Sequence, residues 1–213
     1  MFISLVCMYL CLQAENYMKR ILIIIALIVI GCTCWHFAHT VTRYDLPEGE
    51  LKWTDKRPET AKMCLPAAFT DEKGRILGAY RINGKNYDAN KTMKLKVSLK
   101  GNMFYISKNW MADNGFQQLT LVYNSKPMKF HDARKAVRRA LCKDRDGAFI
   151  LQSNYPMTMS DFASECSKRS TNAAYLDMGE FGYGYIKNRF FTKPLYVWGY
   201  FSRDKQTNWI YIE

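Results

Sequence analysis

The sequence predicts an α+β domain with a curved, largely antiparallel sheet flanked by a few helices. Short apolar runs separated by turn residues indicate strands, and one late segment repeats its apolar residues at helical spacing. The chain has 213 residues, of which 48% are hydrophobic and 15% aromatic, so it can bury one good core. We therefore expect a single domain after an N-terminal membrane segment.

Residues 1–43 are expected to be an export signal or membrane anchor. Lys19 and Arg20 directly precede residues 21–30, an unbroken apolar run. Basic residues before such a run stay on the cytoplasmic side of a membrane. The rest of the chain is therefore predicted to lie outside the cytoplasm, in the cell envelope on the periplasmic or surface side.

Three fates of this segment remain open: retention as an anchor, cleavage, or lipidation at Cys32. As an anchor, residues 21–37 would span roughly 25 Å, slightly less than a bilayer core of about 30 Å. Residues 29–32 resemble the processing box of bacterial lipoproteins. Met18 is an alternative start of the protein, because residues 1–17 are a second apolar stretch with no basic residue ahead of it.

The start of the domain is expected to be a linker followed by a hairpin. Residues 44–60 are polar and contain two prolines, which favours a linker and leaves residues 61–213 as the domain. The apolar runs CLPAAFT and RILGAYRI are separated by DEKG, and NGK follows the second run. Turn residues at these spacings favour β-structure.

The clearest predicted strand covers residues 93–100, where four apolar residues alternate with three lysines and a serine. One face should be buried and the other basic; a solvated outer face is the favoured role of the lysines, and a track for a polyanion is the alternative. NMFYIS and FQQLTLVYNSKP are predicted strands, and the second reaches a turn at Asn124 and Ser125.

Residues 131–153 fit either a helical stripe or a hairpin that turns at DRDG, and we favour the hairpin. Thr158 and Asp161 resemble a capping box, which predicts a helix over residues 159–168. A strand at NAAYLD should follow, and PLYVWGYFS with NWIYIE should form a terminal aromatic hairpin.

The net charge of +12 favours an anionic partner. Residues 1–43 hold three cations and one acid, so the remaining chain carries +10. Nucleic acid, acidic lipid and phosphorylated glycan all fit this charge. The export signal and the lack of a recognisable nucleic-acid motif argue against nucleic acid.

Three cysteines, Cys64, Cys142 and Cys166, belong to the predicted domain, so all three cannot pair with one another. We favour small buried hydrophobic residues, with one disulfide and one free thiol as the alternative. The chain has three histidines and no C-x-x-C or H-E-x-x-H spacing. We therefore expect neither a metal site nor a cofactor.

Several segments between residues 61 and 187 resemble, in order, those of the phosphodiester glycosidase family, which includes the mannose 6-phosphate uncovering enzyme and many bacterial envelope proteins. CLPAAFTDEKGRILG is similar to the family's opening strand and turn, and FQQLTLVYNSK to its next strand. VRRALCKDRDGAFIL is similar to its arginine-containing strand and hairpin. The helix near Met159 and AAYLDMG resemble its helix and its Leu-Asp-Gly-Gly motif.

The resemblance assigns Arg138 to the family's strand arginine, Asp177 to its motif aspartate and Gly179 to the second motif glycine. Several positions depart from the family pattern. Met178 replaces the first motif glycine, and the opening Asn-Gly-Gly and the serines after the motif are replaced by Pro66, Ala67, Ala68, Phe181 and Gly182.

The resemblance implies hydrolysis of the bond between a sugar's anomeric carbon and a phosphodiester, in an envelope or host glycan. Asp177 would stabilise the positive charge of the sugar ring or activate water, and Arg138 would grip the phosphate with two hydrogen bonds. Glu180 would be a second acid. The alternatives are a turn residue for Asp177, a surface residue for Arg138 and a solvated loop acid for Glu180.

Three further residues are candidates for substrate binding. Gly179 would let the ligand approach the backbone, Tyr183 would stack on a sugar ring, and His131 would carry a proton. Core packing is the alternative for Tyr183, and an exposed loop position is the alternative for His131. The alternative function is binding of anionic or phosphorylated glycans on the cell envelope without catalysis, which the basic charge and the altered motifs suggest.

Overall fold

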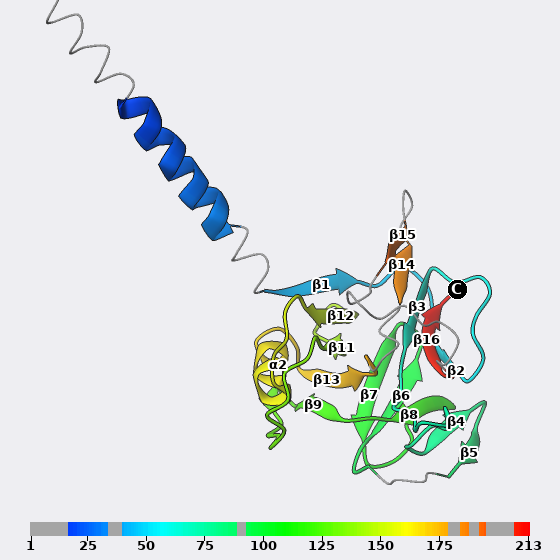
Figure 1. The fold of residues 1–213 in the computed structure, drawn as a ribbon. Helices are drawn as coiled ribbons and strands as arrows, with labels where there is room; N and C mark the ends of the chain where they lie inside the picture. The colour runs from blue at the N-terminus through cyan, green and yellow to red at the C-terminus, as the bar shows by residue number, and fades with distance from the viewer. Residues whose placement is uncertain (1–16, 34–39, 89–92, 179–183, 188–191, 195–206) are drawn as a thin grey trace, which may run out of the picture. The chain divides into compact units, whose positions relative to one another are not determined.

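The computed structural model describes residues 17–33, 40–88, 93–178, 184–187, 192–194 and 207–213 (Figure 1). The chain divides into two units, Met1–Thr40 and Val41–Glu213. In the first unit, residues 17–33 form a helix. Among the residues with a described position, no helix is both long and apolar enough to cross a membrane.

The second unit contains three antiparallel sheets and confirms the predicted α+β class. The first sheet has six strands, in the order β1 (Val41–Asp45), β12 (Ala148–Ser153), β11 (Arg139–Lys143), β13 (Asn172–Leu176), β9 (Thr120–Tyr123) and β10 (Lys126–Pro127). The second has five, in the order β15 (Thr192–Pro194), β14 (Tyr185–Lys187), β3 (Met63–Pro66), β16 (Trp209–Ile212) and β2 (Leu51–Thr54). The third has five, in the order β5 (Lys85–Tyr87), β4 (Tyr80–Ile82), β8 (Asn114–Gln117), β6 (Lys96–Lys100) and β7 (Met103–Ser107).

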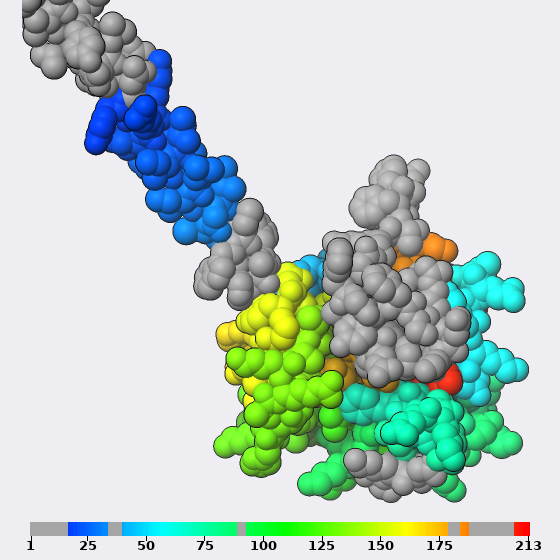
Figure 2. All heavy atoms as spheres, in the orientation of Figure 1, coloured from blue at the N-terminus to red at the C-terminus, as the bar shows by residue number. Residues whose placement is uncertain are grey.

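Two apolar cores lie on opposite faces of the six-stranded sheet. On one face, Leu141, Ile150 and Leu176 pack with buried residues of the other two sheets. On the other face, Ala140 and Tyr175 pack with the helix α2 (Met159–Ser167). Figure 1 shows α2 beside this sheet, and in Figure 2 the light-green and yellow atoms of the segment from β9 to α2 lie together on one side of the domain.

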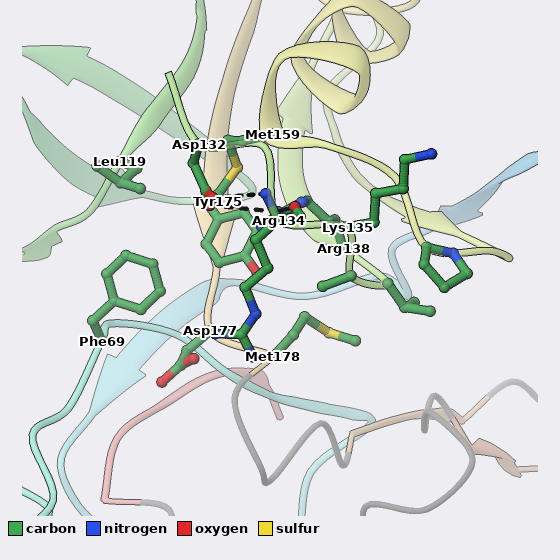
Figure 3. A pocket seen from close by; sticks show the side chains of 13 residues that line it. Phe69, Leu119, Asp132, Arg134, Lys135, Arg138, Met159, Tyr175, Asp177 and Met178 are labelled. Carbon is green, nitrogen blue, oxygen red and sulfur yellow. Dashed lines mark hydrogen bonds and ion pairs between the residues drawn. The ribbon is translucent and has the colours of Figure 1, made fainter. Parts of the chain in front are cut away.

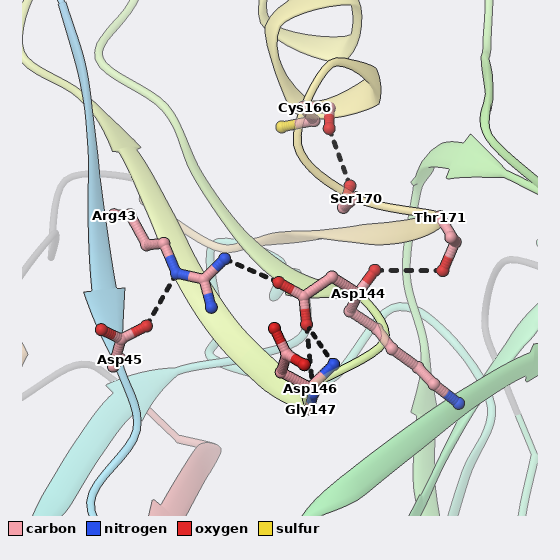
Figure 4. A network of polar contacts seen from close by, with 9 residues as sticks. Arg43, Asp45, Asp144, Asp146, Gly147, Cys166, Ser170 and Thr171 are labelled. Carbon is pink, nitrogen blue, oxygen red and sulfur yellow. Dashed lines mark hydrogen bonds and ion pairs between the residues drawn. The ribbon is translucent and has the colours of Figure 1, made fainter.

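The hairpin expected between residues 131 and 153 is confirmed as β11–β12. Its turn is closed by Asp144, whose Oδ1 accepts hydrogen bonds from the backbone N–H groups of Asp146 (2.9 Å) and Gly147 (3.1 Å) (Figure 4). Arg43 on the neighbouring β1 donates to both Asp45 (2.7 Å) and Asp144 (2.6 Å). The turn chemistry predicted from DRDG therefore sets the register of β11 against β12.

The NGK turn and the Asn124–Ser125 turn are also confirmed. Asn83 and Gly84 join β4 to β5, and Asn124 and Ser125 join β9 to β10, all four with positive φ. The strand β6 differs from the prediction, because its Ser98 is fully buried and accepts a hydrogen bond from Met111 N (2.9 Å). The outer face of β6 is therefore only partly basic.

Two expectations near the chain ends need correction. Residues 44–60, interpreted as a linker, contain the end of β1 and all of β2, because Leu51 and Trp53 are buried core residues. The predicted partner of NWIYIE is residues 194–202, of which only Pro194, the last residue of β15, is among the described residues. NWIYIE itself supplies β16, which pairs with β2 and β3.

The predicted helix is confirmed as α2, and Thr158 is its N-cap. Asp161 N donates to Thr158 Oγ1 (3.1 Å), and Thr158 Oγ1 donates to Asp161 Oδ2 (2.7 Å). The buried stripe is Met159, Phe162, Ala163 and Cys166. The cap fixes where the helix begins, at the edge of the pocket described below.

We expect Thr158→Ala to lower the free energy of unfolding by about 1 kcal/mol, because it leaves the first-turn N–H of Asp161 without its side-chain acceptor. Equilibrium urea unfolding measures this change. Ser164→Ala, an exposed substitution in the same helix, is the control and should change stability by less than about 0.5 kcal/mol. Equal effects of the two substitutions would show that the cap is not responsible.

Candidate functional site

A pocket of about 650 Å³ lies where the ends of β11 and β13 meet the loop before β11 and the segment before α2 (Figure 3). Arg138 immediately precedes β11, and Asp177 immediately follows β13. Arg139 pairs with Leu176 in the antiparallel ladder, so the two candidate residues are carried by adjacent strand ends. Both line the pocket, although almost forty positions separate them in the sequence.

Asp177 is held at the pocket by its backbone. Its N–H donates to Ala67 O (2.9 Å), which joins the end of β13 to the segment that follows β3. The residue is 8% exposed, and its carboxylate is drawn at the side of the pocket nearest Phe69 (Figure 3). The carboxylate therefore lies at a cleft rather than on an open surface turn.

Arg138 is buried, with 4% of its surface exposed, and its guanidinium joins two backbone segments. Nε donates to Met157 O (3.0 Å), and Nη2 donates to Arg134 O (2.6 Å). Nη2 also lies 3.8 Å from Asp132 Oδ2. Two of the three guanidinium nitrogens thus donate to main-chain oxygens. These bonds hold the loop before β11 against the segment before α2.

Tyr175 forms the floor between these two residues. Its ring is tilted against Phe69, with centroids 5.4 Å apart, and the Arg138 Cζ lies 6.0 Å from the Tyr175 centroid. Burial raises the pKa of Tyr175, and the positive charge of Arg138 partly offsets that rise. At neutral pH the hydroxyl is therefore protonated and can donate a hydrogen bond.

Along with Lys135, Arg134 is one of two exposed cations among the described residues that line the pocket. Its backbone N–H donates to Asp132 Oδ1 (2.8 Å), and its side chain extends toward the end of β13, where Asp177 lies (Figure 3). With Lys135 and Arg138, it gives the described lining three cations against two carboxylates. In the sequence, Arg134 belongs to a basic run with Lys135, Arg138 and Arg139, and its only signal is its place four residues before Arg138.

The resemblance to the phosphodiester glycosidases places Ala67 and Ala68 at that family's Asn-Gly-Gly. In the structure these two residues are held by hydrogen bonds to other segments, and we call this segment the joint at Ala68. Ala67 and Ala68 are fully buried. Asn208 Oδ1 accepts from Ala68 N (2.6 Å), and Asn208 Nδ2 donates to Ala68 O (3.0 Å). Gln118 Nε2 and Asp177 N both donate to Ala67 O. The main-chain groups that lie beside the pocket here are therefore bonded within the domain.

Of the remaining candidates, those with a described position do not line this pocket. His131 is exposed and is not among the described residues that line the pocket. Cys32 is exposed on the helix of the first unit. Gly179, Glu180 and Tyr183 lie outside the described residues. Within the part of the chain that the structure describes, no cluster of three or more His, Cys, Asp and Glu side chains could hold a metal ion.

Arg139 is fully buried, and nothing in the sequence distinguished it as a site residue. Its side chain lies on the opposite face of β11 from Arg138, and its Nε donates to Gln152 Oε1 (2.9 Å). Burial lowers the pKa of Arg139 to about 10, while Tyr44 and Tyr175 partly oppose that change. Arg139 therefore remains charged at neutral pH between the sheets.

Comparison with known proteins supports the fold. The catalytic domain of zebrafish N-acetylglucosamine-1-phosphodiester α-N-acetylglucosaminidase, auto-inhibited by its pro-peptide, matches with a TM-score of 0.51 and 11% identity. The match covers 82% of this chain and 73% of that chain. No family model and no curated protein matches the sequence. The resemblance stated from the motifs is thus confirmed at the level of the fold.

Proposed function

We propose that the chain is an exported, membrane-tethered hydrolase that cleaves the bond between a sugar's anomeric carbon and a phosphodiester in an envelope or host glycan. The observation that carries the proposal is one open pocket that holds the Asp177 carboxylate together with the Arg134 and Arg138 cations. The zebrafish protein of similar fold is named for this bond. The pocket of this chain has a volume of about 650 Å³, which is within the range of small-molecule sites.

The reaction places opposite charges on the two parts of the substrate. As the bond between the anomeric carbon and the phosphate oxygen breaks, the sugar ring becomes positive and a phosphate monoester leaves with the bonding electrons. Asp177 would stabilise the ring or take a proton from the attacking water. Because the departing phosphate monoester is a weaker base than a sugar alkoxide, it leaves with little help from a general acid.

The cations divide into two roles. Arg134, which is exposed in the pocket, would contact the phosphate, and Arg138, whose Nε and Nη2 bind backbone oxygens, would position the loop that carries Arg134. This replaces the two-bond phosphate grip expected of Arg138. The tether would be the N-terminal segment, residues 1–43, as an anchor or through lipid on Cys32, with the domain in the cell envelope.

A second function, binding of phosphorylated glycans without turnover, is favoured by the joint at Ala67 and Ala68. The residues of the opening Asn-Gly-Gly are replaced there, and the remaining main-chain groups are bonded to Asn208, Gln118 and Asp177. A site that lost those contacts could still hold an anion through Arg134.

We expect Arg134→Gln to weaken binding of a sugar phosphodiester about tenfold, because it removes a charge-assisted hydrogen bond to the phosphate. Calorimetric titration with methyl phosphodiesters of N-acetylglucosamine, glucose and mannose 1-phosphate measures this loss, and release of the free sugar reports turnover. Arg145→Gln, in the exposed β11–β12 turn, makes the same charge change outside the pocket lining and should leave binding unchanged.

The results separate the two functions. Release of free sugar and methyl phosphate supports hydrolysis, whereas saturable binding without release supports the binding protein. If no member of the panel binds, or if Arg145→Gln weakens binding as much as Arg134→Gln, the proposed site is wrong.

A further inference from the structure

Two of the three domain cysteines meet in the core beneath α2. Cys142 is in β11, and Cys166 is in the last turn of α2. Both are free thiols in the structure, fully buried in the same apolar cluster. A hydrogen bond between the two side chains raises the pKa of the Cys166 thiol. Figure 4 shows Cys166 at this end of the helix, where Ser170 Oγ donates to Cys166 O (2.8 Å).

The third cysteine belongs to a different part of the fold. Cys64 is buried in β3, in a separate cluster with Ala61 and Trp209. Burial raises the pKa of its thiol to about 12. Three cysteines cannot all pair with one another, and the contact selects one pair from the three possible pairs.

We propose that Cys142 and Cys166 form a disulfide that joins β11 to α2. Each thiol loses a proton, one S–S bond forms, and the two electrons pass to a disulfide oxidant such as oxidised glutathione, which is released as two thiols. In the oxidising compartment proposed for this domain, such an exchange is thermodynamically favoured. The bond closes a loop that contains β12 and the segment leading to α2.

The bond must form during folding rather than afterwards. The contact with Cys142, together with burial, raises the pKa of the Cys166 thiol, and thiolate is the species that attacks a disulfide. A fully buried pair is also inaccessible to an oxidant. The site lies at the end of α2 away from Thr158, so the bond stabilises the helix without entering the pocket.

The experiment refolds the full chain from denaturant in reduced and oxidised glutathione, alkylates the remaining thiols and digests the product with trypsin. Cys142 and Cys166 lie on different tryptic peptides, residues 140–143 and 146–168. Mass spectrometry should find these two peptides joined, and Cys64 alkylated. Separately alkylated Cys142 and Cys166, or a link from either of them to Cys64, would overturn the assignment.

Thermal unfolding supplies a second measurement. We expect the Tm of the oxidised chain to exceed that of the reduced chain by about 10 °C, because the link restricts the unfolded state. Cys142→Ala and Cys166→Ala should each abolish this difference, and Cys64→Ala should keep it. The Tm of each variant is compared between its own oxidised and reduced forms, so any destabilisation caused by the substitution cancels. If Cys64→Ala lost this difference in Tm, the Cys142–Cys166 pairing would be refuted. These outcomes are independent of sugar binding or hydrolysis.

Discussion

Asp177→Asn is expected to lower the rate of sugar phosphodiester hydrolysis by about a thousandfold, since the amide can neither stabilise a positive sugar ring nor accept a proton. The backbone bond from residue 177 to Ala67 O does not involve the side chain, so the fold should persist. Release of free sugar under saturating substrate measures the loss, and circular dichroism checks the fold.

Asp132→Asn is the matched control for this substitution. Asp132 lines the same pocket, its side chain is 53% exposed, and its Oδ1 accepts from Arg134 N, a bond that asparagine can keep. We expect its rate to stay within about threefold of the unmodified chain, because an exposed carboxylate at this edge does not contact the reacting carbon. Undiminished hydrolysis in Asp177→Asn, or equal losses in both variants, would exclude Asp177 as the catalytic carboxylate.

Asn208→Ala is expected to lower the free energy of unfolding by about 4 kcal/mol. The substitution leaves Ala68 N–H and C=O buried without their partners, and each such group costs about 1–3 kcal/mol. Equilibrium urea unfolding with an unchanged m value measures it. The large effect reflects two bonds that join β16 to the segment after β3, far apart in the sequence.

Asn154→Ala provides the comparison, because Asn154 accepts a hydrogen bond from Thr42 Oγ1 (3.0 Å) at the exposed surface of the protein. Water can replace this bond when the side chain is removed. The effect of this substitution should stay below about 0.5 kcal/mol. A loss of less than 1 kcal/mol in Asn208→Ala would mean that water or a local shift satisfies the Ala68 groups. The main chain at Ala68 would then not be held rigidly by Asn208, and it would no longer favour binding without turnover.

The joint at Ala68 also bears on the choice between the two proposed functions. It lies next to the pocket, and its main-chain groups are committed to Asn208, Gln118 and Asp177. Among the described residues, a hydrolase would then depend on Asp177 and the loop cations. Measuring turnover together with binding therefore distinguishes the two proposed functions.

Local sequence patterns correctly predicted those parts of the fold that depend on neighbouring residues. Alternation predicted β6, the Thr158 cap and its apolar stripe predicted α2, and turn residues with positive φ marked the turns at Asn83 and Asn124. Each signal comes from interactions within a few positions along the chain, so local pattern is sufficient.

Contacts between residues far apart in the sequence became visible only once the chain was folded. It placed β2 beside β16, set Asp177 near Arg134, gave Arg138 two backbone acceptors and brought Cys142 to Cys166. Which donor reaches which acceptor depends on the packing of strands and helix from separate parts of the chain. A local pattern carries no information about those distances, and for that reason the sequence indicated a basic run but could not assign its arginines.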